Sequence, residues 1–260
     1  MKAAPFAYRR PESLEEAVAA LAEGGEEARV LAGGQSLVPM LAFRVARPSL
    51  LVDVNRLPLD RVEVLAGGEV RIGAVVRQRA AERSGVAPLA EALRWVAHPP
   101  IRNRGTVVGS VCHADPAAEL PALALALDGV LEVRSAAGTR ELPVAELLVG
   151  PLMTSLRPGE LAVALRLRPR QGWRWHVREV ARRQGDFALA GVVAGVPPDR
   201  GGPCRVAVFG ASGRPYVVDG PADELPALAA ARADPASDVH ADAAYRRHLV
   251  EALTRRALAP

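Results

Sequence analysis

The chain has 260 residues, half of them apolar, and a net charge of only +4, so it can bury one large core or two ordinary ones. Its only lysine, Lys2, leaves no internal candidate for a Schiff base or a phosphate-binding P-loop, and its two cysteines, Cys112 and Cys204, are too few for an iron–sulfur cluster. The low aromatic content and the absence of an apolar run of roughly 18 residues predict a soluble, cytoplasmic protein with no nucleic acid partner and no membrane span.

A capped helix and a glycine turn are predicted near the N-terminus. Apolar residues recur at helical spacing over residues 13–23, where Ser13 and Glu16 form a capping box. An apolar run at residues 29–32 then breaks at two glycines and resumes at residues 37–41. This pattern predicts a strand, a glycine turn and a short helix.

Short strands and helices follow over the middle of the chain. Strands are predicted at residues 50–54, 62–65, 70–74, 130–134 and 139–143, and helices at residues 77–83, 88–96 and 121–127. The polar residues 102–106 predict a loop before the last of these helices.

Residues 170–172 are typical of a joint, because a new cycle of strands followed by helices begins after them. Strands are predicted at residues 173–180, 188–196 and 204–209, and helices at residues 225–232 and 241–257, the last of them capped by Asp238 or Asp242. We therefore expect two units, residues 1–168 and 172–260, the first with subparts at about 1–55 and 56–168.

The glycine turn at residues 32–37 is the first candidate binding site. Gly33 and Gly34 allow a tight turn at a strand end, so that the following N–H groups and the Ser36 hydroxyl can converge on an oxyanion such as a pyrophosphate. An ordinary turn between a strand and a helix has the same sequence pattern.

A second candidate loop, residues 102–110, combines two glycines, two hydroxyl side chains and two arginines. It could supply further N–H and hydroxyl donors to the same anion, with arginine balancing its charge. The two loops, each expected between a strand and a helix, favour a split dinucleotide site. Neither matches the G-x-G-x-x-G fingerprint of a Rossmann unit, so the site would be of another type.

Acidic residues and a histidine follow the second loop. His113, Asp115 and Glu119 lack the paired spacing of metal ligands, so no metal site is expected. A carboxylate here could accept hydrogen bonds from a cofactor, or Glu119 could simply open the next helix, and the same two interpretations apply to Asp186. A Ser-His-Asp hydrolase is not supported, because the chain has no G-x-S-x-G elbow, and no catalytic side chain is predicted.

The ordered set of motifs resembles the FAD-binding medium (middle) subunit of molybdenum hydroxylases, the family of aerobic carbon monoxide dehydrogenase and heterotrimeric xanthine-dehydrogenase-like enzymes. The resemblance runs nearly end to end. It rests on Tyr8, Pro11 and residues 13–17, on residues 32–40 with Arg44 and Pro48, on residues 53–55 and 72–74, on residues 98–99, 101–106, 109–110 and 113–116, and on residues 183–188 and 245–249.

The resemblance implies an α+β fold. The first part would be a two-part FAD-binding domain of the non-Rossmann PCMH (vanillyl-alcohol-oxidase) type. A smaller α+β C-terminal domain of the carbon monoxide dehydrogenase flavoprotein type, with an antiparallel sheet, would follow it.

The resemblance also implies roles for single residues. Both glycine loops would hold the pyrophosphate of a non-covalent FAD, Glu119 would be the acidic residue on the FAD where related enzymes usually have aspartate, and Phe187 after Asp186 would lie beside the isoalloxazine. The candidate cofactor-binding residues are Ala32, Gly33, Gly34, Gln35, Ser36, Leu37, Thr106, Val107, Gly109, Ser110, Asp115, Glu119, Asp186 and Phe187.

Val108 departs from the family pattern, because the second loop usually reads Thr-Ile-Gly-Gly and valine replaces the first of these glycines. If that position needs a positive φ or a close approach to phosphate, valine costs on the order of 1 kcal/mol or more and weakens FAD binding. We expect binding to survive, because the first loop and Gly109 remain.

The function implied by the resemblance is electron transfer in a heteromeric complex. A small subunit would carry 2Fe–2S clusters, a large subunit would carry the molybdenum cofactor, and the FAD of this chain would pass electrons to an external acceptor, in an assembly expected to be a dimer of heterotrimers. The alternatives are a self-sufficient FAD oxidoreductase and a two-domain scaffold without a cofactor.

Overall fold

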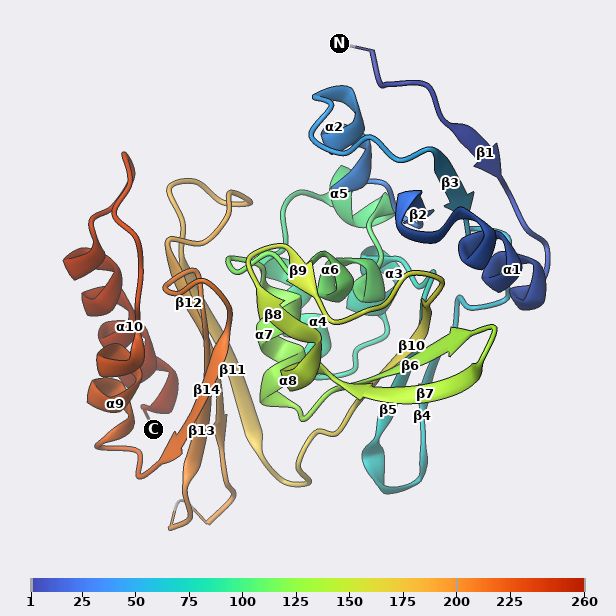
Figure 1. The fold of residues 1–260 in the computed structure, drawn as a ribbon. Helices are drawn as coiled ribbons and strands as arrows, with labels where there is room; N and C mark the ends of the chain where they lie inside the picture. Colours follow the sequence, from blue (N-terminus) through green and yellow to red (C-terminus); the bar gives the residue numbers. More distant parts are fainter. Residues whose placement is uncertain (1, 200, 260) are drawn as a thin grey trace.

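In the computed structural model, which describes residues 2–199 and 201–259, the N-terminal part of the chain forms a three-stranded parallel sheet (Figure 1). Its strands lie in the order β1 (Ala7–Arg9), β3 (Leu50–Asp53) and β2 (Ala28–Leu31), and its helices are α1 (Leu14–Gly24) and α2 (Leu37–Ala42). The Ser13 hydroxyl accepts a 3.1 Å hydrogen bond from the Glu16 amide, which confirms the predicted N-cap.

A five-stranded antiparallel sheet follows, and its central strand is one that the sequence pattern did not predict. The strand order is β4 (Val62–Val64), β5 (Val70–Gly73), β10 (Leu161–Leu167), β6 (Val130–Ser135) and β7 (Gly138–Pro143). The predicted hairpins form β4 with β5 and β6 with β7, and β10 joins them by pairing antiparallel with β5 and β6.

Short helices connect and cover these strands. They are α3 (Gln78–Arg83), α4 (Leu89–Trp95), α5 (Pro99–Arg104), α6 (Val107–His113), α7 (Glu119–Ala126) and α8 (Val144–Leu147), with a small hairpin of β8 (Leu148–Gly150) and β9 (Met153–Thr154) after them. The prediction of a loop at residues 102–106 was wrong in part, because Pro99 at the first helical position starts a helix that includes residues 102–104. Of the second glycine segment, residues 102–110, only Gly105 and Thr106 therefore lie between helices, with the other residues in α5 and α6.

The C-terminal part forms a four-stranded antiparallel sheet with two helices. The strands lie in the order β11 (Arg174–Val180), β12 (Ala190–Val196), β13 (Cys204–Phe209) and β14 (Tyr216–Gly220), and the helices are α9 (Leu225–Arg232) and α10 (Ala243–Leu258). Strand β14 was not predicted. Of the two candidate caps of the last helix, Asp242 is the cap, because its carboxylate accepts the Tyr245 amide at 2.7 Å.

The C-terminal sheet is covered on both faces, by α9 and α10 on one side and by α7 on the other (Figure 1). Strand β12 is consequently buried at every position. Val177, Val193 and Phe209 of this sheet belong to the same hydrophobic cluster as α4 and α7, so one core continues across the joint. The expectation of an α+β fold with an antiparallel C-terminal sheet is confirmed. Within the described residues, no helix is long and apolar enough to cross a membrane.

Candidate functional site: a cavity between two glycine segments

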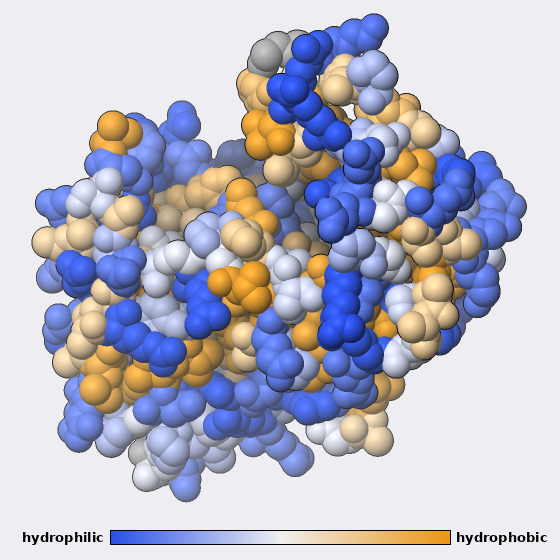
Figure 2. Space-filling view, in the orientation of Figure 1, coloured by the Kyte–Doolittle hydropathy of each residue, from blue (hydrophilic) through white to orange (hydrophobic). Residues whose placement is uncertain are grey.

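A cavity of about 890 Å³ lies between the N-terminal sheet, the helices after β5 and the loop that joins β11 to β12. The surface is hollowed beneath the N-terminal lobe that carries α2 (Figure 2). All of the candidate cofactor-binding residues except Val107 line this cavity. Its volume suits a ligand as large as a nucleotide cofactor, because sites for drug-sized ligands occupy roughly 300–1,000 Å³.

The first glycine segment, residues 32–37, lines the cavity and has backbone amides that are not used in hydrogen bonds among the described residues. Gly34 has φ +73°, a conformation that glycine adopts without strain and that turns the following amides toward one side. Among the described residues, no oxygen accepts the amides of Gly34, Gln35 and Ser36, whereas the Val38 amide donates to Gly34 O at 2.9 Å. The Ser36 hydroxyl makes no capping bond. These groups are available to an anionic ligand.

The second glycine segment also offers donors, although with a shift of one residue from the expectation. Thr106 caps α6, and its Oγ1 accepts the Gly109 amide at 3.2 Å, which leaves the hydroxyl proton free to donate. The Val107 amide donates to Val76 O at 3.2 Å, so it is not available to a ligand, and its side chain is buried in the core. Val108, whose amide has no acceptor among the described residues, lines the cavity instead.

The two segments lie backbone against backbone. A Cβ placed on Gly33 would overlap Arg104 O, and it would lie 2.7 Å from Gly105 Cα and 3.0 Å from Thr106 N. Only glycine permits this approach. Residues of both segments line one cavity, and each segment has amides without an acceptor among the described residues. A single pyrophosphate could bind to both sets, so the residues present fit an FAD.

The arginines at the cavity are not the ones that the sequence suggested. Arg102 is buried, where it donates to Val96 O and Ala97 O and pairs with Glu82 at 3.0 Å, so it cannot also balance a ligand charge. The cationic side chains that line the cavity are Arg29 and Arg157, both exposed. Neither arginine could be predicted from the sequence pattern, because each lies outside the glycine segments.

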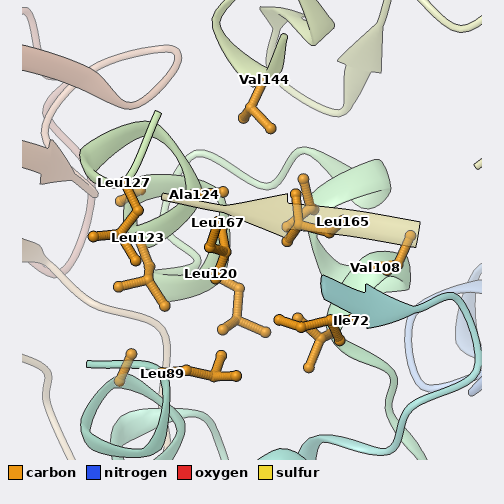
Figure 3. Packing of buried hydrophobic residues seen from close by; sticks show 14 of the residues in the cluster. Ile72, Leu89, Val108, Leu120, Leu123, Ala124, Leu127, Val144, Leu165 and Leu167 are labelled. Atoms are coloured by element: carbon orange, nitrogen blue, oxygen red, sulfur yellow. The ribbon is translucent and has the colours of Figure 1, made fainter. Parts of the chain in front are cut away.

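Val108 does not occupy a strained position. It is the second residue of α6, with no positive φ, and its side chain is 2% exposed, in the cluster that holds Ile72 and Leu165 (Figure 3). Of the two conditions on which valine was expected to weaken FAD binding, a positive φ and a close approach to phosphate, the positive φ is therefore absent.

Replacing Val108 with glycine should destabilise the protein without improving its affinity for flavin. Val108→Gly leaves a cavity in the core and puts glycine inside a helix, so we expect a loss of about 2–4 kcal/mol in the free energy of unfolding, measured by urea denaturation of the apo chain. Titration of the same protein with FAD provides the second measurement. A variant that binds FAD more tightly than the wild type would show that valine obstructs the phosphate.

Two carboxyl groups with raised pKa values lie near each other, Glu119 at the cavity wall and Glu179 on the C-terminal sheet, outside the cavity lining. Glu119 is 9% exposed and lines the cavity, and burial, assisted by the charge of Asp115, raises its pKa to about 7. Glu179 on β11 has a buried Oε2 without a hydrogen-bond partner among the described residues, and burial and the charge of Glu119 raise its pKa to about 8. Near neutral pH Glu179 is therefore largely protonated and Glu119 partly so, and a protonated carboxyl group can donate as well as accept a hydrogen bond.

The loop between β11 and β12 forms one edge of the cavity mouth. Phe187 is 68% exposed although it lines the cavity, and the Asp186 carboxylate accepts from Arg183 Nε at 3.1 Å. Gly185 packs on the His98 ring, 2.7 Å from where its Cβ would lie, which ties the loop to the start of α5. An exposed aromatic side chain at this edge can cover a flat ring system.

Several lining residues were missed by the sequence reasoning. They lie in residues 152–162 or are Met40, Gln78 and Cys112. Burial raises the pKa of the Cys112 thiol to about 12. Residues 152–162 lead into β10, so recognising that strand would have been the only signal for them. No group of three or more His, Cys, Asp or Glu side chains in the described part of the chain could hold a metal ion.

Comparison with protein families matches residues 4–169 to the FAD binding domain in molybdopterin dehydrogenase. The 6-hydroxypseudooxynicotine dehydrogenase complex subunit alpha of Paenarthrobacter nicotinovorans is 39% identical over 100% of this chain and 95% of its own length. The carbon monoxide dehydrogenase medium chain of Hydrogenophaga pseudoflava is 33% identical over 97% of this chain and 96% of its own.

Solved structures are similar over the whole chain. The reconstituted CO dehydrogenase from Oligotropha carboxidovorans superposes with a TM-score of 0.94, 30% identity and coverage of 99% of this chain and 98% of that chain. Quinoline 2-oxidoreductase from Pseudomonas putida 86 gives a TM-score of 0.92, 34% identity and coverage of 99% and 97%. The chain belongs to the family of FAD-binding domains in molybdopterin dehydrogenases, as the FAD-binding medium subunit of a multisubunit oxidoreductase of the molybdenum hydroxylase type.

Proposed function

We propose that this chain is the electron-transfer subunit of its complex and that its cofactor is held by the fourteen residues predicted above, with the amide of Val108 replacing that of Val107. The observation that supports this most directly is the pair of glycine segments whose free amides face one cavity. When bound, FAD supplies the redox chemistry that lets such a subunit take electrons from 2Fe–2S clusters of a partner and pass them to an external acceptor.

The side chains and amides of this chain would bind and orient that cofactor. The amides of Gly34, Gln35 and Ser36 would bind the pyrophosphate together with the Thr106 hydroxyl, because no acceptor for any of these protons exists among the described residues. Glu119 would hydrogen-bond the polar part of the cofactor from its buried position. Phe187 would cover the ring system and limit access of water to it.

We further propose the organisation of the complex. The FAD-binding unit would be residues 1–168 and the C-terminal unit residues 172–260. The names of the relatives, medium chain and medium subunit, support a large and a small partner, and we propose a cytoplasmic dimer of heterotrimers with the molybdenum cofactor and the clusters on those partners. The mass of the complex, by light scattering after co-expression of the three chains, tests this stoichiometry, and a single heterotrimer would contradict it.

The visible spectrum of the purified chain tests the cofactor assignment. We expect flavin absorption at about 450 nm. Acid should release the FAD intact, because the proposed attachment is non-covalent. Reduction of that flavin by the reduced small subunit, followed in a stopped-flow mixer, tests the electron-transfer role. A colourless protein that cannot be reconstituted would indicate a scaffold, and a stable monomer that turns over an organic substrate alone would indicate a self-sufficient oxidoreductase.

A further inference from the structure

The two glycine segments contact each other without any direct hydrogen bond between them in the described part of the chain. The contact of Gly33 with the backbone at Arg104 and Gly105 sets the shortest distance between the two segments. A van der Waals contact of this kind stops the segments from approaching further, but it does not stop them from moving apart. Groups that bond to both segments are therefore needed to keep their amides at a fixed distance from each other.

Two side chains outside the cavity make that link. Arg77 Nη1 donates to Arg104 O at 2.6 Å, and Arg77 Nη2 donates to Asn55 Oδ1, also at 2.6 Å. Asn55 Nδ2 in turn donates to Ala32 O at 2.8 Å. We call this chain of hydrogen bonds, from Ala32 O through Asn55 and Arg77 to Arg104 O, the loop clamp. It connects the carbonyl just before the first glycine pair to the carbonyl just before Gly105.

Each side chain of the loop clamp is itself held in place. The Asp53 carboxylate accepts the Asn55 amide at 2.9 Å and Asn55 Nδ2 at 2.6 Å, and it also accepts the Tyr8 hydroxyl. Arg77 precedes α3, and its backbone bridges Thr106, so the backbone of Arg77 is held against the second glycine segment. Because the guanidinium is planar and donates through two nitrogens at once, it sets a separation between its acceptors that a single ammonium could not.

We propose that Arg77, acting through Asn55, is a positioning residue that holds the two glycine segments at the separation at which their amides bind one pyrophosphate. Neither side chain is among the residues that line the cavity, so both act on the ligand only through the backbone. This inference rests on the proposed FAD site. It assigns affinity for the pyrophosphate to two residues that no glycine motif contains.

The test compares ligands with and without a pyrophosphate on the full-length apo chain. We expect Arg77→Met to weaken the binding of FAD and of ADP by about 10–100-fold, because the two hydrogen bonds donated by the charged guanidinium are lost. Riboflavin binding should change by less than about twofold. Arg79→Met is the matched control, because it removes the same charge two residues away, where Arg79 pairs with Glu82 at 2.7 Å. The control should bind all three ligands as the wild type does.

Further variants distinguish a clamp from a simple charge. Arg77→Lys keeps the charge but cannot bridge both oxygens, so we expect it to lose most of the affinity that Arg77→Met loses. Asn55→Ala should act like Arg77→Met, and the double variant should lose less than the product of the two, because both remove one connection. Asn55→Ala also provides the test if Arg77→Met does not fold.

Two results would overturn the proposal: FAD affinity in Arg77→Met or Arg77→Lys equal to that of the wild type, or a loss of riboflavin binding as large as the loss of ADP binding. A wild-type chain that binds neither FAD nor ADP would instead refute the proposed function. The two failures are therefore distinguishable.

Discussion

Gly33→Ala should reduce the affinity for FAD by at least about 100-fold, which corresponds to about 2.7 kcal/mol of binding free energy. The added methyl group would overlap Arg104 O and lie 2.7 Å from Gly105 Cα, so it would meet backbone atoms that have no rotamer to change. The two glycine segments would have to separate, and their amides could no longer face the same pyrophosphate. Quenching of FAD fluorescence on titration with the apo chain measures the effect.

Gly213→Ala is the matched control for this substitution. A Cβ at Gly213 would only touch Pro151, at 3.7 Å, and Gly213 has no positive φ, so the same chemical change there should leave both FAD affinity and stability within about 0.5 kcal/mol of the wild type. If Gly33→Ala binds FAD within a factor of three of the wild type while remaining folded, the close approach of the two segments does not matter for binding.

The parts of the fold with strong local signals could be predicted from the sequence. The N-cap at Ser13 and the hairpins after Leu65 and Ser135 each depend on residues a few positions apart, so local pattern was sufficient. The reciprocal bond of the predicted capping box is not made to Ser13, because Glu16 Oε2 accepts the Glu12 amide instead. For the last helix, the sequence pattern predicted two candidate capping aspartates and could not decide between them. Both Asp238 and Asp242 cap backbone amides, and only the three-dimensional path of the chain decides which one starts the helix.

Strand β10 could not be predicted with the same reasoning, although it is the centre of its sheet. Residues 161–167 are buried at all but one position, so they lack the alternation of a half-exposed strand. The partners of β10 are β5 and β6, which come from hairpins far earlier in the chain. Pairing between strands so distant in sequence leaves no local trace.

The candidate site shows the same division. The glycine segments could be proposed from the sequence, because glycine and hydroxyl residues mark amides available for an anion. These segments and the acids after them line the cavity. Glu179 was not found, since a single acid on an edge strand has no distinguishing pattern until the fold places it near Glu119. The loop clamp was missed for a similar reason: Asn55 and Arg77 each lie far in sequence from at least one of the carbonyl groups that the clamp links.

Glu179 should make the apo protein less stable as the pH rises from 5 to 8. Its folded-state pKa of about 8, and that of Glu119 of about 7, lie above the value of about 4.3 for an unfolded chain. The folded state therefore binds more protons over this interval. The contribution to stability is fully present below the unfolded pKa and is lost as the pH rises through the folded pKa values.

Glu179→Gln should remove the part of this dependence that Glu179 contributes, because the amide keeps the shape of the protonated acid and cannot ionise. We expect the variant to be more stable than the wild type at pH 8 by about 2 kcal/mol or more, and to differ little at pH 5, in urea denaturation at both pH values. Glu141→Gln is the control, since it removes a carboxylate whose side chain is 62% exposed, and it should leave the difference between the two pH values unchanged. Equal effects of the two substitutions would mean that Glu179 ionises freely in the folded protein, and that water or an unidentified cation reaches its buried oxygen.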